Sequence, residues 1–268
     1  MSFLTLDNVS HYYFSANGYT KALEGISLTI HEGEFVSIIG PSGCGKSTIL
    51  SIIARLMKQT EGEIKLKNKN FIDVPLNIGY MLQEDYLFPW KTVLENILIG
   101  PKINDQLTDK TKIRARQLLK EVHLEDTEQM YPSELSGGMR QRIALVRTLI
   151  TNPEILLFDE PFSALDYVTK LRLENVVAKL MKAYNKTAIL VTHDLGEAIS
   201  MSDRIFLMES APGRIAKTFE VPTELRNETP FFVRRRPEYQ PIFDEIWQHL
   251  NDDMSEMERG LAKYERNN

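Results

Sequence analysis

The segment with the clearest chemistry lies at residues 40–48, GPSGCGKST, which fit the pattern G-x-x-x-x-G-K-[ST]. Glycines allow a tight turn that brings several backbone N–H groups to one anion, and a helix that follows adds the positive end of its dipole. Lys46 would then reach the β- and γ-phosphates of a nucleotide, and the Ser47 hydroxyl would bind magnesium. The alternative is a glycine-rich turn that binds nothing. The pattern predicts a phosphate-binding loop, made of Gly40, Pro41, Ser42, Gly43, Cys44, Gly45, Lys46, Ser47 and Thr48.

Two adjacent carboxylates, Asp159 and Glu160, follow the apolar run at 155–158. Four apolar residues without alternation favour a central parallel strand, and α/β sheets place ligands at the C-terminal ends of such strands. One carboxylate can serve magnesium while the other faces an attacking water, because side chains alternate along a strand; the alternative is a pair of solvated carboxylates. The next apolar run, 187–192, ends at His193. That histidine can donate a hydrogen bond to a phosphate, or it can be an ordinary packed side chain.

Two further groups are candidates for binding a nucleotide. Ser136 fits the N-cap of a helix, and Gly137 and Gly138 would expose backbone amides there as a second anion site. A helix cap without a ligand is the alternative. Ahead of the phosphate loop, Tyr13 can stack on a nucleotide base, or it can pack the sheet edge with the aromatic residues at 12 and 14.

Several runs predict the elements that hold these groups. A buried strand at 35–39 leads into the phosphate loop, and a helix at 47–57 leads out of it. Alternating apolar residues predict two short, half-exposed strands at 3–9 and 26–30. From 84 to about 152 the character is helical. The other expected elements are short strands at 64–67 and 77–82, a helix opened by 163–166, a hairpin of 204–208 and 215–219 with its turn at 211–213, and an amphipathic helix at 242–250.

The composition indicates an ordinary soluble globular protein, because 43% of the 268 residues are hydrophobic and 26% are charged. The net charge of −5 supplies no broad basic surface, so we expect no nucleic-acid partner. No apolar run approaches the roughly 20 residues of a membrane helix and no leader pattern is present, so we expect the chain to stay in the cytosol. The single cysteine, Cys44, cannot form an internal disulfide.

The tail after residue 220 is rich in proline and charge. We expect its amphipathic helix to cap its own domain, and not to bind a partner. For the arginines at 234–236 we expect a solvated charge run; contact with anionic lipid or with an acidic patch of a partner is the alternative.

In their order and spacing these motifs resemble those of the nucleotide-binding subunits of ABC transporters, over about residues 1–220. Residues 40–48 look like Walker A, 155–160 like Walker B, and LSGGM at 135–139 like the ABC signature, with Met139 where many members carry glutamine. Gln83 looks like the Q-loop residue, 163–166 like the D-loop and His193 like the switch histidine. Tyr13 falls where the family has its adenine-stacking aromatic residue.

The resemblance implies an α/β fold: a P-loop NTPase (RecA-like) core with a mostly parallel sheet, an N-terminal antiparallel β subdomain and an inserted α-helical subdomain. It places an ATP-binding domain at 1–220, with the helical subdomain at about 84–152, and leaves 221–268 as a C-terminal helical tail.

The resemblance also implies the cofactors and the roles of the site residues. ATP and Mg²⁺ would be sandwiched between two copies of the chain, and Ser136, Gly137 and Gly138 would complete the neighbour's site. Cys44 would lie beside bound phosphates, so we expect ATP to shield its thiol. The implied roles are a general base or water-polarising carboxylate for Glu160, γ-phosphate binding for His193 and Lys46, magnesium binding for Ser47 and, through water, for Asp159, and sensing of magnesium and water for Gln83.

Within the family, the segments at 87–90, 134–142, 192–198, 202–204 and 212–214 look most like importers of the nitrate, sulfonate and taurine group. This implies an ATPase at the cytoplasmic face of the membrane, bound to integral permease subunits and serving an extracytoplasmic solute-binding protein. The segment 84–90 would meet the membrane subunit. The alternatives are the ATPase of an ABC exporter and a soluble ABC protein acting on nucleic acid; the latter would need a long coiled coil or tandem units that this chain lacks.

Overall fold

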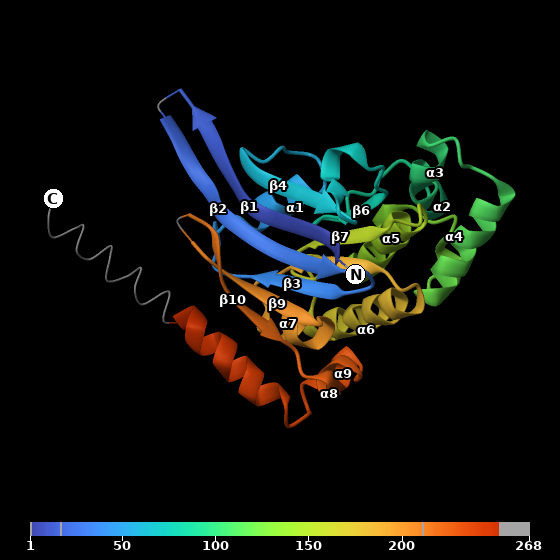
Figure 1. Ribbon diagram of the computed structural model, residues 1–268. Helices are drawn as coiled ribbons and strands as arrows, with labels where there is room; N and C mark the ends of the chain where they lie inside the picture. The colour runs from blue at the N-terminus through green and yellow to red at the C-terminus, as the bar shows by residue number, and fades with distance from the viewer. Residues whose placement is uncertain (1, 17, 211, 252–268) are drawn as a thin grey trace, which may run out of the picture.

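The computed structural model of the chain describes residues 2–16, 18–210 and 212–251, and within them it contains two sheets with helices around them (Figure 1). The strands are β1 (Ser2–Ser15), β2 (Gly18–His31), β3 (Phe35–Ile39), β4 (Glu61–Leu66), β5 (Lys69–Asn70), β6 (Ile78–Met81), β7 (Ile155–Asp159), β8 (Thr187–Val191), β9 (Arg204–Glu209) and β10 (Arg214–Glu220). The α-helices are α1 (Lys46–Ile53), α2 (Val93–Ile97), α3 (Ile99–Ile103), α4 (Asp109–Glu121), α5 (Gly137–Leu149), α6 (Tyr167–Ala183), α7 (Leu195–Met201), α8 (Thr223–Arg226) and α9 (Pro230–Val233). Short 3₁₀ turns lie at Phe71–Asp73, Glu125–Thr127 and Pro132–Glu134.

The larger sheet has the order β10-β9-β3-β8-β7-β6, and all of its neighbouring strands are parallel except β10, which is antiparallel to β9. Every residue of β3 and β8 is buried, as continuous apolar runs in a sheet covered on both faces require. Because β3, β8 and β7 are parallel neighbours, their C-terminal ends meet at one edge. That edge is where the phosphate loop, the two carboxylates and His193 follow their strands.

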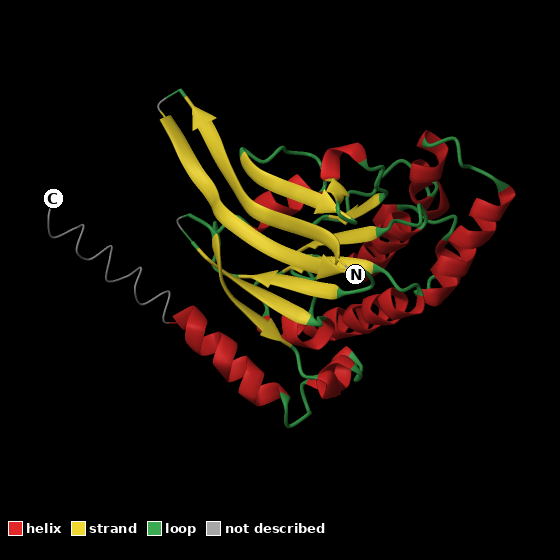
Figure 2. Ribbon diagram, in the orientation of Figure 1, coloured by secondary structure: helices red, strands yellow, loops and turns green. Residues whose placement is uncertain are grey.

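The smaller sheet, of order β2-β1-β4-β5, is antiparallel. β1 and β2 have 14 residues each and extend together beyond the other strands (Figure 2). The prediction of two short, half-exposed strands is therefore wrong in length. Pairing continues past Val9 through several register shifts, so that Tyr13 lies opposite Thr20 within the hairpin. The prediction is confirmed in burial: Leu4, Leu6 and the other apolar residues of the inner face are buried in one core with α1 and the larger sheet, and the polar residues between them are exposed or half-buried.

Helices α4, α5 and α6 lie on the opposite face of the larger sheet from α1. Ala115, Leu118 and Leu119 form an apolar stripe on α4 and are buried in a second core with α5 and α6, in agreement with the helical character predicted for this region. The helical character does not begin at residue 84, because 84–92 lie outside helices and strands and α2 starts only at Val93, where Thr92 and Glu95 form a capping box. The first helix is also shorter than 47–57: it ends at Ile53. Among the described residues, no helix is both long and apolar enough to cross a membrane.

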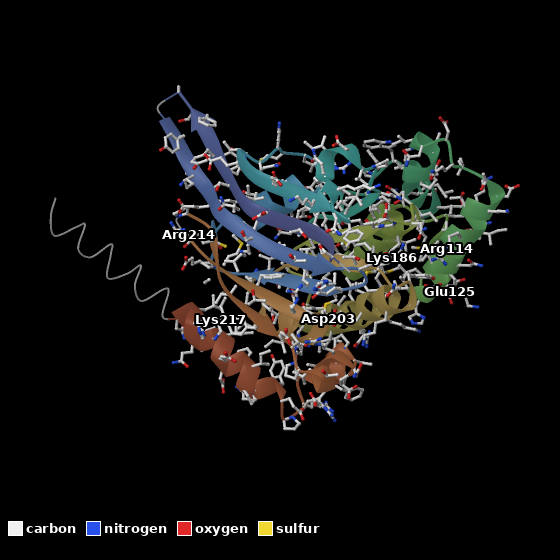
Figure 3. The ribbon with its side chains drawn as sticks, viewed as in Figure 1. Arg114, Glu125, Lys186, Asp203, Arg214 and Lys217 are labelled. Atoms are coloured by element: carbon white, nitrogen blue, oxygen red, sulfur yellow. The ribbon has the colours of Figure 1, made fainter. Side chains whose placement is uncertain are left out.

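The tail packs back on the chain. After α8 and α9, residues 239–251 form a helix that lies beside β10 (Figure 1), and its Ile242 and Ile246 are buried with Phe219 in a third core. Lys217 of β10, labelled in Figure 3, donates a hydrogen bond to Glu245 of this helix at 2.8 Å. The expected capping by the amphipathic helix is confirmed for the described part of the tail. The expected hairpin of β9 and β10 is also present, although residue 211 of its turn lies outside the described residues.

The expectation of a solvated charge run is wrong for one of the three tail arginines. Arg234 pairs with Glu174 of α6, whose side chain is fully buried. Arg235 and Arg236 are exposed, as predicted.

Candidate active site

The phosphate loop follows β3 and ends where α1 begins at Lys46. Gly45 has a φ of +94°, and a Cβ at this position would lie 2.5 Å from Leu23 Cδ2, so the turn requires glycine. Lys46 is folded over the loop, with Nζ donating to the carbonyl oxygens of Gly40 at 2.9 Å and Pro41 at 2.8 Å. The ammonium therefore lies at the centre of the turn that the pattern predicts to hold phosphate.

A cavity of about 620 Å³ opens over this loop. Its lining brings together predicted residues of three segments: Tyr13, the phosphate loop and Glu160. The full lining is Tyr13, Thr20, Lys21, Ala22, Ser42, Gly43, Gly45, Lys46, Ser47, Thr48, Glu160, Ser210, Pro212 and Gly213. The volume is that of a ligand pocket for a small organic molecule.

Oxygen donors gather beside the loop at the end of β7. Ser47 Oγ donates to Asp159 Oδ1 at 3.2 Å, and the Tyr80 hydroxyl donates to Asp159 Oδ2 at 3.3 Å. Burial raises the pKa of Asp159, against the opposing effect of these two hydrogen bonds. Burial, with the neighbouring Asp159 charge, likewise raises the pKa of Tyr80 to about 12. A carboxylate and a hydroxyl are ligands that Mg²⁺ accepts, and a bound cation would offset the burial of the carboxylate, so the residues fit a magnesium site.

Glu160 lines the cavity and is in contact with His193. His193 Nδ1 is 3.2 Å from Glu160 Oε2, and the histidine side chain is 64% exposed. Glu160 has a φ of +47°, and its N–H donates to Val191 O at 2.9 Å. The two parallel strands β7 and β8 thus bring the predicted base and the predicted phosphate ligand into contact.

Gln83 is not brought to the magnesium ligands. Its Nε2 donates to Ser163 Oγ at 3.1 Å, and its carbonyl oxygen accepts a hydrogen bond from Gln141 at 2.8 Å. Among the described residues no hydrogen bond joins the Gln83 side chain to Ser47 or Asp159.

Tyr13 stands on the loop side of the hairpin. Its hydroxyl lies 3.2 Å from Thr48 Oγ1, its ring packs edge-on against His11 at 4.9 Å, and its side chain is 43% exposed. Tyr12 and Phe14 instead contact Tyr19. The packing alternative therefore describes the neighbours of Tyr13, whereas Tyr13 itself lines the cavity.

The second predicted anion site is built separately. Ser136 is the N-cap of α5 and accepts a hydrogen bond from the Met139 N–H at 3.4 Å, and Gly137 and Gly138 form the first turn. Ser136 and Gly138 line another cavity, of about 670 Å³, between α5 and α6. None of the residues that line this cavity lines the cavity over the phosphate loop. Within one described chain, the two half-sites do not meet.

Cys44 differs from its expected environment. Its side chain is fully buried, and burial raises the pKa of the thiol. Only the backbone of Cys44 can face a ligand in the loop, so the expectation that ATP shields the thiol is wrong: the fold already does so.

Sequence patterns missed part of the cavity wall. Thr20, Lys21 and Ala22 come from β2 and Gly213 from the turn before β10, and these segments are joined by a hydrogen bond from the Gly213 N–H to Ala22 O at 3.0 Å. Arg214, labelled in Figure 3, adds a hydrogen bond from Nε to Glu24 Oε2 at 2.8 Å. No local pattern marks these residues as part of a cavity, because contact between the two sheets creates the wall.

Comparison with known proteins decides the family. A family model described as "ABC transporter" matches residues 23–163. The chain belongs to the ABC transporter family. It is an ATP-binding subunit of this family, with the ATPase activity of such subunits, and the predicted family and enzyme class are confirmed.

Three curated ABC proteins show the range of relatives. The chain is 52% identical over 267 residues, a coverage of 100% for each chain, to the uncharacterized ABC transporter ATP-binding protein YtlC of Bacillus subtilis. It is 41% identical over 81% of its length and 85% of the relative to the aliphatic sulfonates import ATP-binding protein SsuB of Bacillus cereus. It is 36% identical over 97% of its length and 98% of the relative to the taurine import ATP-binding protein TauB of Roseobacter denitrificans.

Among solved structures, the chain resembles the ATP-binding cassette MJ0796, in a dimeric post-hydrolysis state bound to ADP and phosphate. The TM-score is 0.72 at 35% sequence identity, with 82% of this chain and 99% of the other covered. The predicted fold class, a P-loop ABC ATPase with an N-terminal antiparallel sheet, is confirmed.

Proposed function

We propose that this ABC ATPase binds and hydrolyses MgATP between two copies of the chain and couples the reaction to uptake of a small solute through separate membrane subunits. The observation that carries the proposal is the separation of the two half-sites within one chain. A second copy would bring Ser136, Gly137 and Gly138 to the phosphate loop of the first. The dimeric state of the MJ0796 cassette supports this arrangement.

In the proposed site the triphosphate lies over the phosphate loop. Lys46 and the loop amides bind its oxygens, and the Tyr13 ring stacks on the base. Ser47 and Asp159 hold Mg²⁺, the latter through water, and the ion when bound neutralises charge on the β- and γ-phosphates. Gln83 would reach the ion and the water only after its side chain leaves Ser163.

Hydrolysis in this proposal depends on the contact between Glu160 and His193. The Glu160 carboxylate polarises the attacking water as the general base, and His193 donates a hydrogen bond to the γ-phosphate. Their separation of 3.2 Å supports this assignment, because one pair of side chains would then align both the water and the phosphate.

The membrane partner is proposed to bind an exposed apolar surface at 82–90. Leu82, Tyr86 and Trp90 are exposed there, and the Trp90 ring packs on Phe88 at 5.4 Å. The segment is anchored from behind by Arg140, whose Nε donates to Asp85 at 2.8 Å. A rigid loop with projecting aromatic side chains suits a protein contact.

Import of a sulfonate, taurine or nitrate-like solute is the finer part of the proposal. It is supported by the names of the SsuB and TauB relatives and by the motif details at 87–90 and 134–142. The chain would work at the cytoplasmic face of the membrane, with permease subunits as direct partners and an extracytoplasmic solute-binding protein as an indirect one.

Glu160→Gln tests the catalytic assignment. The substitution removes the charge and keeps the shape, so steady ATP hydrolysis should fall by at least about a hundredfold while ATP still binds. Glu154→Gln, just before the other end of β7, is the matched control and should hydrolyse ATP like the wild type. Wild-type turnover in the Glu160→Gln variant would disprove the assigned role.

A further inference from the structure

A network of charged side chains connects the tail to the loop that carries His193. Arg234 pairs with Glu174 of α6 through two hydrogen bonds, Nη1 to Oε2 at 3.1 Å and Nη2 to Oε1 at 3.3 Å. One turn earlier on α6, Lys170 Nζ contacts Asp194 at 2.5 Å and Glu197 at 2.6 Å. α6 therefore carries Lys170 and, one turn later, the Arg234 partner Glu174, and the network reaches Asp194, the residue next to His193.

The carboxylates of this network are buried. The Glu174 side chain is fully buried and that of Glu197 is 3% exposed, whereas the Arg234 side chain is 18% exposed. A buried carboxylate of this kind is costly unless it is paired, so the Arg234 guanidinium has a fixed place in the fold. The planar guanidinium forms a two-pronged pair that a lysine could not reproduce.

Arg234 also touches the helix that begins beside His193. A Cβ on Gly196, in the first turn of α7, would lie 3.0 Å from both Nε and Nη2 of Arg234. The guanidinium thus lies against bare backbone at the start of α7. Asp194, the N-cap of that helix, accepts the Glu197 N–H at 3.1 Å.

His193 has little support of its own. Its ring is near Glu160, and the described residues offer it no other hydrogen bond or ion pair. Its place is set by the backbone on either side, where the Asp194 N–H donates to Thr192 Oγ1 at 3.0 Å and Thr192 in turn bonds to Glu197. A group that fixes α7 therefore fixes His193.

We propose that Arg234 is a positioning residue for His193: the tail, docked through Arg234 on Glu174 and Gly196, holds the start of α7 and with it the histidine in register with Glu160. This inference rests on the proposed catalytic role of His193. It gives the tail a part in hydrolysis although the tail lies outside the cavity that holds the nucleotide.

The test separates positioning from stability in the full-length chain. Arg234→Met leaves Glu174 unpaired, so it should lower both the unfolding temperature and kcat. Adding Glu174→Met removes the unpaired charge and should restore the unfolding temperature. The double variant should still show a kcat reduced about tenfold, with KM for ATP unchanged within about twofold, because misplacing a reacting group affects the chemical step.

Arg235→Met is the matched control. Because Arg235 is exposed, this substitution should leave hydrolysis unchanged. Wild-type kcat in the double variant with restored stability would overturn the inference, because the ion pair would then be structural only.

A second experiment tests whether the effect of Arg234 on hydrolysis depends on His193. In a His193→Ala background, which should itself be slower by about a hundredfold, the Arg234→Met/Glu174→Met pair should cause no further loss. A further tenfold loss there would overturn the inference while leaving the role of His193 intact. Wild-type turnover of His193→Ala alone would instead show that the proposed function of His193 is wrong.

Discussion

Glu160, the proposed general base, has an unusual backbone conformation. Its φ of +47° is uncommon for a residue with a side chain, and its carbonyl oxygen accepts a hydrogen bond from Ser163 Oγ at 2.9 Å. With its N–H bonded to Val191, the residue is held from both sides and its carboxylate is directed to His193. A strained conformation that its surroundings enforce is typical of a preorganised reacting group.

The burial of Cys44 predicts how its thiol reacts. The thiol is buried and its pKa is raised, so less thiolate is present at neutral pH and an alkylating reagent has little access to the sulfur. Alkylation of the folded chain should be slow, should quicken only as the pH rises above the range of an exposed thiol, and should proceed at the same rate with and without ATP. Mass spectrometry of a time course measures this.

The control for Cys44 is a thiol on the exposed side of the same loop. In a Cys44→Ala background, Ser42→Cys should react quickly and be protected by ATP, since Ser42 is exposed and lines the cavity. Rapid, ATP-protected alkylation of Cys44 itself would contradict the buried orientation.

At the scale of elements, the first turn of α5 offers two adjacent glycines in different surroundings. A Cβ on Gly138 would lie 2.3 Å from Thr169 Cγ2, whereas a Cβ on Gly137 meets only Arg140 Nη2, at 3.9 Å. Gly138→Ala should therefore destabilise the chain by about 1–3 kcal/mol, and Gly137→Ala should not. If the turn faces the nucleotide of a second copy, Gly137→Ala should nevertheless slow ATP hydrolysis.

Chemical denaturation and ATPase assays of the two variants give the answer. Equal losses of stability would contradict the packing of α5 on α6. A fully active, stable Gly137→Ala variant would contradict the contact with the neighbouring nucleotide.

The elements also show what the sequence can predict. The buried strands β3, β7 and β8 and the residues that follow them were predictable, because continuous apolar runs and the glycine and carboxylate motifs are local. Residues 10–15 of β1 were not, since their pairing depends on β2, and neither was the partnership of Tyr80 with Asp159, which depends on the register of β6 beside β7. The prediction of a solvated Arg234 is wrong because no sequence pattern near Arg234 indicates its ion pair with Glu174.

At the scale of the whole molecule, the proposed function requires a membrane partner and a second copy of the chain. Trp90→Ala should weaken solute transport by reconstituted complexes more than it weakens ATP binding, because Trp90 is 69% exposed and does not line the cavity over the phosphate loop. The other tryptophan, Trp247 of the tail helix, is also exposed, and Trp247→Ala should leave transport unchanged. Unchanged transport in the Trp90→Ala variant would count against the proposed contact.

In the proposed function, one chain holds only half of a catalytic site. Sedimentation velocity of the Glu160→Gln variant tests it directly, because this variant should bind ATP without hydrolysing it. With Mg²⁺ and ATP the mass should rise from that of one chain, 30.8 kDa, to twice that value, and an added Ser136→Arg substitution should prevent the rise while ATP still binds. If the Glu160→Gln variant binds ATP and remains a single chain, or if it dimerises equally well after Ser136→Arg, the site is not shared between two chains in the proposed way.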